Sequence, residues 1–404
     1  MSLSTKAGQF TMPGSTGNQS VTGLGFQPKF IFFFYQIATA NNSYGSVLKS
    51  IGGIGFTDGT NQASLGGAFG ASRTTQQPFT TKCIHGSNAG SAASIVSMDS
   101  DGFTVNWSNV TDSGSLIQFL ALGGSDLTNA SIVSKAFPTA TGNQSVTGVG
   151  FKPDCILLFA NVDAPNANSK LMVGAASSTT KRAAQGSFAK DSSTQNGTSA
   201  SNKLVEALGP DGSGNAQLYY EADLVSFDSD GFTANWSTVA GTIAVSYYTI
   251  CLKGAAFHVQ ELTQPTSTGN QTLTGFGFQP KGIYIMDNGY YSSGIRTGYG
   301  TSFSASDGTN QYTAVINQIA SGGGGTQSLD VTSNTSLIRH FTATTPTIVS
   351  DATLSSFDSD GLTLNWSVAD SNQRKSLLLA FGNSSISPTI SGISTIQGIS
   401  SITF

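Results

Sequence analysis

The side chains with the most reactive chemistry in this chain are three histidines and an aspartate pair that occurs three times. His85, His258 and His340 do not share one position of a repeat, so they do not form a common set of general acids and bases. Glycosidases need two carboxylates across a cleft, whereas the repeated carboxylates here are one residue apart. They are Asp99 with Asp101, Asp228 with Asp230, and Asp358 with Asp360. A Gly-x-Ser-x-Gly elbow, an HExxH motif and a phosphate-binding loop are also absent from the sequence. We therefore predict no enzymatic activity and no cofactor.

Each aspartate pair belongs to an Asp-Ser-Asp-Gly sequence that directly precedes an alternating segment. After the first, Phe103, Val105 and Trp107 alternate with polar residues, which is the period of a half-buried strand. The four residues before the strand are typical of a turn, so the pattern predicts one arm of a hairpin. Two aspartates before glycine also resemble part of a calcium loop, but that loop needs further oxygen ligands downstream, where this chain has Asn106 and Trp107. A structural turn is favoured, and calcium binding is the alternative.

Other segments of the chain read as strands with glycine-rich turns between them. The run from Phe30 to Tyr35 is apolar without alternation, which indicates a strand covered on both faces, and the same holds for Cys155 to Ala160. Apolar strands such as Leu116 to Leu122 follow the hairpins. No segment shows a convincing period of 3.6 residues. The fold class predicted is all-β, with antiparallel β-sandwiches of jelly-roll type.

Two markers show that the chain is built from three tandem copies of one domain. The first begins Thr-Gly-Asn-Gln, with its glycine at Gly17, Gly142 and Gly269, and the second is the Asp-Ser-Asp-Gly turn. The spacing of each marker is the size of a whole domain rather than of a solenoid unit. The predicted domains are residues 1–127, 128–256 and 257–385, followed by a tail of residues 386–404. A domain of this length can bury a core without disulfides or metal.

The middle of each copy differs from the others, which is typical of loops that contact partners. Copies one and three share Asp-Gly-Thr-Asn-Gln at Asp58 and Asp307, and copy two has another sequence there. Copy three carries Tyr290, Tyr291 and Tyr299, with further tyrosines nearby. Flat rings beside amide groups suit a sugar face or a protein hot spot, so these three are candidate glycan or partner contacts. Core packing is the alternative for some tyrosines of this group, which also includes Tyr284 and Tyr312.

The last nineteen residues follow a different pattern, in which isoleucine recurs at every third position. The residues are Ile390, Ile393, Ile396, Ile399 and Ile402. A spacing of three matches neither a helix nor an ordinary strand. It favours a polyproline-like segment, a solenoid turn or an extended strand held by partner chains. We predict an assembly tail, with docking against the third domain as the alternative.

The composition argues against several classes of binding partner. Only 10% of the residues are charged and the net charge is −4, so the clustered Lys and Arg of a nucleic-acid-binding protein are missing. No apolar run approaches the length needed to span a bilayer, and the N-terminal residues lack the apolar core of a signal peptide. We expect no nucleic acid, no membrane insertion and synthesis in a cytoplasm. Cys83, Cys155 and Cys251 form no CxxC pair and are predicted to be buried free thiols without metal.

The markers resemble a family of tandem modules in virion proteins of tailed bacteriophages. Such modules begin Thr-Gly-Asn, continue through Gly-Phe-x-Pro-Asp into an apolar strand, and end in Ser-Phe-Asp-Ser-Asp-Gly-Phe. Copy two matches from Thr141 to Asp154 and from Ser226 to Phe232, while the other copies have Lys29 and Lys281 in place of Asp154. The resemblance covers residues 1 to about 385.

This resemblance implies a structural virion protein, made in the host cytoplasm, whose partners are other virion proteins. We expect a non-enzymatic capsid decoration or tail accessory attached through residues 386–404, in a homo-oligomeric or symmetric assembly. Three domains in one chain could also imitate a trimer around a local threefold axis. The alternative is a tail-associated adhesin for host attachment, which recognises host-surface glycans.

Overall fold

The structure is a computed structural model that describes most of the chain. The described residues are 2–42, 45–47, 49–70, 75–79, 81–86, 90–161, 168–169, 171–190, 196–211, 213, 215–240, 246–289, 299–319, 327–341 and 347–384. Within these ranges every regular element is a strand and all strand pairs are antiparallel, which confirms the predicted all-β class. None of the described residues forms a helix long and apolar enough to cross a bilayer.

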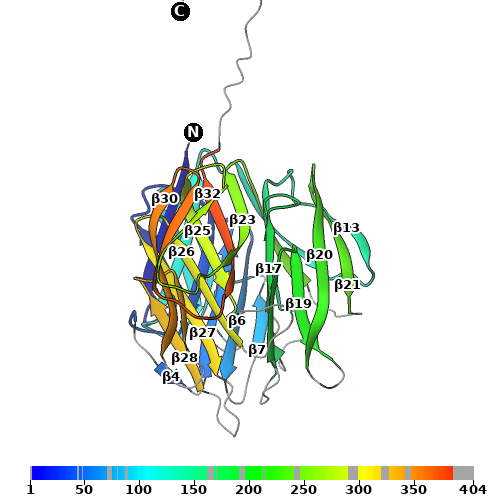
Figure 1. Ribbon diagram of the computed structural model, residues 1–404. Coiled ribbons are helices and arrows are strands. Elements are labelled where there is room, and N and C mark those ends of the chain that lie inside the picture. The colour runs from blue at the N-terminus through cyan, green and yellow to red at the C-terminus, as the bar shows by residue number, and fades with distance from the viewer. Residues whose placement is uncertain are drawn as a thin grey trace, which may run out of the picture.

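Each of the three tandem segments folds into a sandwich of a larger inner and a smaller outer sheet (Figure 1). In the first domain the inner sheet has the order β1 (Leu3–Thr11), β11 (Leu116–Gly124), β3 (Pro28–Gln36), β5 (Lys49–Thr57), β6 (Gln62–Gly70) and β7 (Thr75–Phe79). Its outer sheet has the order β2 (Gly17–Thr22), β10 (Gly102–Asn109), β9 (Ala92–Asp99) and β8 (Ile84–His85).

The second domain repeats this plan. Its inner sheet has the order β12 (Asn129–Ala136), β22 (Ser246–Lys253), β14 (Cys155–Asn161), β16 (Leu171–Ala176), β17 (Arg182–Lys190) and β15 (Asn168–Ser169), with β18 (Asn196–Ser201) also paired to β17. Its outer sheet has the order β13 (Gly142–Val146), β21 (Gly231–Val239), β20 (Ala216–Asp228) and β19 (Val205–Pro210).

The third domain adds one strand that comes from the first domain. Its inner sheet has the order β23 (Ala256–Thr263), β32 (Lys375–Gly382), β25 (Pro280–Asp287), β26 (Tyr299–Ser306), β27 (Gln311–Ile319), β28 (Gln327–Ser333) and then β4 (Gly45–Val47). Its outer sheet has the order β24 (Gly269–Thr274), β31 (Gly361–Val368), β30 (Ile348–Asp358) and β29 (Ile338–Phe341). Strand β4 therefore ties the first domain to the edge of the third.

The two ends of each domain pair as in a jelly roll. In the first domain β11 lies between β1 and β3, while β10 pairs with β2 in the other sheet. The middle strands β5, β6 and β7 instead pair with one another in chain order. The sandwich is thus jelly-roll-like at its ends and a meander in its middle.

The predicted strand alternation is confirmed in the outer sheets. Phe103, Val105 and Trp107 are buried, and the equivalent Trp236 and Trp366 are 1% exposed. These residues pack against the inner sheet of their own domain and form one private core per domain. The hairpin predicted at the Asp-Ser-Asp-Gly turn is also present, since β9 and β10 pair across it.

A further core lies between the domains, and it is larger than any private core. Adjacent residues of β3 divide between the two kinds of core, because side chains alternate across a strand. Phe33 packs in the private core of the first domain, whereas Phe32 belongs to a cluster that also contains Phe159 of the second domain and Tyr284 of the third. The inner sheets therefore face one another around a common axis. The shared core shows that the three domains are arranged as a ring, a point that the sequence left open. No domain buries its inner face alone.

The three cysteines are buried and free, as predicted. Cys155 and Cys251 lie on paired strands, but Cys155 points into the shared core and Cys251 into the private core of the second domain. They sit on opposite faces of one sheet, so the pleat itself keeps the two sulfur atoms from bonding.

Candidate functional site: the two ends of the ring

The ring has two unlike ends, which Figure 1 shows at the top and the bottom. The junction end holds Ser2, both interdomain connections and Ser384. Its parts are linked directly: the Asp126 N–H donates to Ser2 O at 3.3 Å, and the Ser384 N–H donates to Asp126 Oδ2 at 3.0 Å. The far end lies at the other ends of the strands, where β3 and β25 stop and where β4 pairs with β28.

The junction end contains the repeated aspartate turns. In the first domain Asp101 accepts the N–H groups of Gly23 and Gly25 at 3.1 and 2.6 Å, and both glycines have a positive φ that other residues rarely adopt. The same bonds recur at Asp230 and Asp360, and they hold the pKa of these two carboxyls below its ordinary value. The second aspartate of each pair therefore fixes a Gly-x-Gly loop.

The first aspartate of each pair also has hydrogen-bond partners inside the turn. Asp99 accepts the hydroxyls of Ser97 and Thr104 at 2.6 and 2.8 Å, and Asp228 and Asp358 make the same pair of bonds in the other domains. In the described part of the chain, no group of three or more His, Cys, Asp or Glu is placed to hold a metal ion. Hydrogen bonds within the turn and to the Gly-x-Gly loop engage both aspartates of each pair, so we interpret both as structural residues.

Side-chain oxygens join each domain to the next near the junction end. The Ile132 N–H donates to Asp58 Oδ2 at 3.2 Å, the Val259 N–H to Ser177 Oγ at 3.3 Å, and the Ala7 N–H to Asp307 Oδ2 at 3.1 Å. The three donors are the tenth residue before the marker glycine of their own copy. The bonds run from domain one to two, two to three, and three to one, so we call Asp58, Ser177 and Asp307 the acceptor belt. A heterologous contact that returns to its start after three steps closes a ring.

A second set of polar side chains lies nearer the far end. Gln36, Asn161 and Asn288 each stand nineteen residues after a marker glycine, and each is at most 1% exposed. Gln36 Nε2 donates to Val331 O of the third domain, and Asn288 Nδ2 donates to Gly186 O of the second at 2.9 Å. Two of the three amides at this repeat position thus reach from one domain to its neighbour. These three residues stand at the same distance from their marker glycines in the sequence, but they belong to no recognisable motif.

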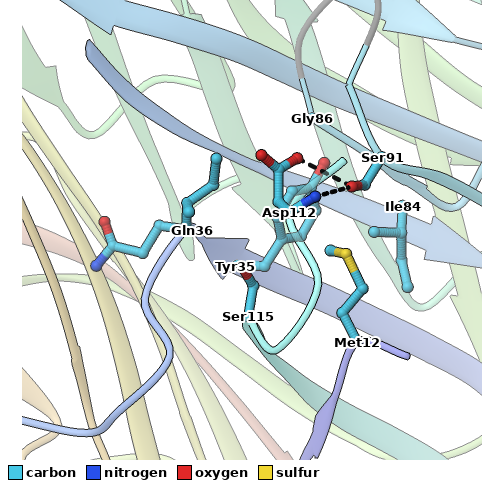
Figure 2. Close-up of a pocket in the computed structure, with 9 residues that line it drawn as sticks. Met12, Tyr35, Gln36, Ile84, Gly86, Ser91, Asp112 and Ser115 are labelled. Carbon is cyan, nitrogen blue, oxygen red and sulfur yellow. Dashed lines mark hydrogen bonds between the residues drawn. The ribbon is translucent and has the colours of Figure 1, made fainter. Parts of the chain in front are cut away.

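At the far end of each domain, the end of the first strand lies beside the loop that leads to the last strand. This corner is built differently in each domain. In the first domain Met12, Tyr35, Ile84 and Ser115 line a cavity of about 10 Å³, which has room for one water molecule (Figure 2). Ser91 closes one side, because its Oγ donates to Asp112 Oδ2 at 2.9 Å and accepts the Asp112 N–H at 3.0 Å.

The equivalent corner of the third domain is a buried polar network. Asp287 Oδ2 accepts a bond from Ser376 Oγ at 2.5 Å and lies 3.2 Å from His340 Nε2, while Gln264 Oε1 accepts the Ser350 hydroxyl. Burial acts to raise the pKa of Asp287, but His340 and the hydrogen bonds hold it below its ordinary value. Sequence reasoning missed this pair, because its members are 53 residues apart and have no counterpart in the other copies.

The corner of the second domain is aromatic. Phe137 packs against Tyr220 with ring centroids 4.4 Å apart and against Tyr247 at 5.2 Å, and Trp236 lies beside them. The same corner thus holds a small cavity, a buried polar network and an aromatic cluster in the three domains. The Asp-Ser-Asp-Gly turns of the junction end, by contrast, make the same bonds in each copy.

The tyrosine group predicted as a contact surface is divided by the structure. Tyr284 is 1% exposed and stacks on Phe32 with centroids 4.8 Å apart, so it is a core residue. Tyr312 is partly buried against the shared core. Tyr290 and Tyr291 lie outside the described residues, and Tyr299 begins β26 with a side chain that is not described. Core packing, the alternative for this group, thus holds for Tyr284, while the contact prediction for Tyr290, Tyr291 and Tyr299 stays a prediction.

The predicted assembly tail also lies outside the described residues, since these end at Ser384. Two bonds fix the residues that lead to it. The Leu3 N–H donates to Asn383 Oδ1 at 2.9 Å, and Ser384 binds Asp126 as described above. The last described residues before the tail are therefore held at the junction end. Comparison of the sequence with models of known protein families and with the sequences of characterised proteins found no match.

Proposed function

We propose that this chain is a non-enzymatic structural protein of a tailed-bacteriophage virion. It serves as a capsid decoration or tail accessory, and it is attached to other virion proteins through residues 386–404. The module markers support the virion assignment, because they resemble the tandem modules of such proteins. The geometry supports the mode of attachment.

The observation that carries the proposal is the closed ring with a single junction end. Three similar domains surround one shared core, and the acceptor belt repeats the same bond at each of the three interfaces. A surface of this kind matches a site of local threefold symmetry with one chain in place of three. Ser384, two residues before the proposed attachment segment, is held at the end where the turns repeat, which supports attachment through that end.

The experiment compares full-length protein with a variant that lacks residues 386–404. Purified particles of the phage that encodes the chain, assembled without it, are mixed with each protein and sedimented. A second variant replaces Ile390, Ile393, Ile396, Ile399 and Ile402 by serine, and its matched control carries Ser391→Ala and Ser394→Ala. We expect the control to bind particles like the full-length protein, and the truncated and serine variants to remain folded but not to bind.

Two results would contradict this proposal. Binding of the truncated protein at full strength would remove the tail from the mechanism. Absence of the protein from mature particles, tested with an antibody and negative-stain imaging, would remove the virion assignment itself.

The far end favours a second candidate function, which is adhesion to host-surface glycans. Strand β25 ends there, and Tyr290 and Tyr291 follow it in the sequence. Flat rings beside amide groups suit a sugar face. Tyr290→Ala and Tyr291→Ala would abolish binding to host cells if these residues form the contact. Unchanged binding by both variants would exclude them.

A further inference from the structure

An open groove of about 350 Å³ lies between the first and second domains near the junction end. One wall is the turn from Asp58 to Asn61, which belongs to the first domain. The other wall is the start of β12 with Asn129, and Phe151 from the loop after β13 lies at the base. The volume falls within the range of small-ligand sites in proteins.

The single charged side chain that lines the groove is already engaged. Asp58 Oδ1 accepts the N–H groups of Thr60 and Asn61 at 2.8 and 2.6 Å, and Oδ2 accepts Asn61 Nδ2 and the Ile132 N–H. A cation would have to displace four hydrogen bonds, including one bond of the acceptor belt. An anion would meet the negative charge of Asp58 without a cationic partner in the lining. The groove therefore suits a neutral ligand.

The rest of the lining is hydroxyl, amide and apolar surface. The side chains of Thr60, Asn129 and Ser131 make no hydrogen bond within the described part of the chain, and each of them lines the groove. Hydroxyl and carboxamide groups both donate and accept, as the adjacent hydroxyls of a sugar ring require. Ala130 and Phe151 supply apolar surface for the C–H face of such a ring.

We propose that this groove binds a neutral saccharide. The proposal is independent of the particle-attachment function, because none of the groove residues belongs to the tail. It also differs from the far-end adhesin surface, since it lies near the opposite end of the ring.

The equivalent interface between domains two and three carries other residues at these positions. There Asn129, Ala130 and Ser131 are replaced by Ala256, Phe257 and His258. The His258 ring stacks on Phe276 with centroids 4.3 Å apart. Lys181 Nζ also reaches across to Gly275 O at 3.4 Å.

One substitution in the test introduces a residue that the chain itself carries at that interface. Ala130→Phe introduces the residue of the third domain and should fill the groove. Thr60→Ala removes one hydroxyl from the lining, and Thr309→Ala is its matched control at the equivalent turn of copy three. Full-length protein is screened on an array of bacterial surface saccharides, and the best binder is titrated by NMR.

We expect wild type and Thr309→Ala to bind alike, and Ala130→Phe not to bind. Thr60→Ala should bind about tenfold more weakly, a loss that equals the ~1.4 kcal/mol of one hydrogen bond. The absence of any bound saccharide for the wild type would overturn the proposal, as would binding that Ala130→Phe leaves unchanged. Sedimentation with particles, run on the same Ala130→Phe protein, should be unaffected. That readout separates a failure of the groove from a failure of the attachment function.

Discussion

Two adjacent phenylalanines of β3 test whether the ring unfolds as one unit. Phe32 and Phe33 are 2% and 1% exposed, and they point to opposite faces of the inner sheet. Phe32 stacks on Tyr284 of the third domain, with centroids 4.8 Å apart, whereas Phe33 packs edge-on against Phe103 of its own domain at 5.5 Å. Replacing either by alanine should cost about 3–5 kcal/mol.

The size of the cooperative unit decides how far the melting temperature moves. Unfolding entropy is about 2.1 cal/mol/K per residue, so it totals about 0.85 kcal/mol/K for the whole chain and about 0.27 kcal/mol/K for one domain. A loss of about 3–5 kcal/mol then lowers Tm by about 4–6 °C if all three domains melt together, but by about 11–19 °C if the first domain melts alone. Because the shared core contains residues of every domain, we expect the smaller shift for both variants.

Differential scanning calorimetry measures both the shift and the number of transitions. The wild type should give one transition whose calorimetric and van't Hoff enthalpies agree. Phe159→Ala, which alters the shared core from the second domain, should lower the same transition by a similar amount. A separate early transition in Phe33→Ala, with the remaining heat absorption unmoved, would refute the single-unit reasoning.

Two further predictions concern acid and the indole groups. Burial lowers the pKa of His85 from its ordinary value of 6.5 to about 4. Between these two pH values the unfolded chain binds a proton that the folded chain does not. The free energy of unfolding should therefore fall by up to about 3 kcal/mol as pH decreases across that window. Urea titrations should show a shallower decline for His85→Gln, and an identical decline would show that His85 is not its cause. Trp107 and Trp366 donate to glutamine oxygens at 2.8 and 3.0 Å, whereas Trp236 Nε1 is buried and has no hydrogen-bond partner among the described residues. Phenylalanine at Trp236 should accordingly cost about 1–3 kcal/mol less than at the other two positions, and equal losses in denaturant titrations would contradict this.

Local pattern was sufficient to predict much of the fold. The alternation around Trp107 identified the buried face of β10, and the apolar run from Phe30 to Tyr35 identified a strand covered on both sides. Both predictions follow from side-chain periodicity within one strand, which does not depend on what the strand packs against. The constant offsets of the markers likewise predicted three tandem copies.

The candidate site was less accessible to such reasoning. Copies one and three visibly shared Asp58 and Asp307, but the purpose of these residues became apparent only when Ile132 and Ala7 were found as their donors. The sequence left open whether Tyr284 packs in a core, and the structure shows that it does, because Phe32 of the neighbouring domain stacks on its ring. Contacts between residues far apart in the sequence leave no periodic trace in it.

The sequence by itself determined the class of fold, the number of modules and the turn chemistry that each module repeats. Only the tertiary structure decided that the inner sheets enclose one common core and that the acceptor belt closes a ring. The physical reason is that an apolar run specifies burial but not the partner that provides it. In this protein the partner of each inner sheet is the other two domains, and their arrangement depends on hydrogen bonds between distant residues such as Val259 and Ser177.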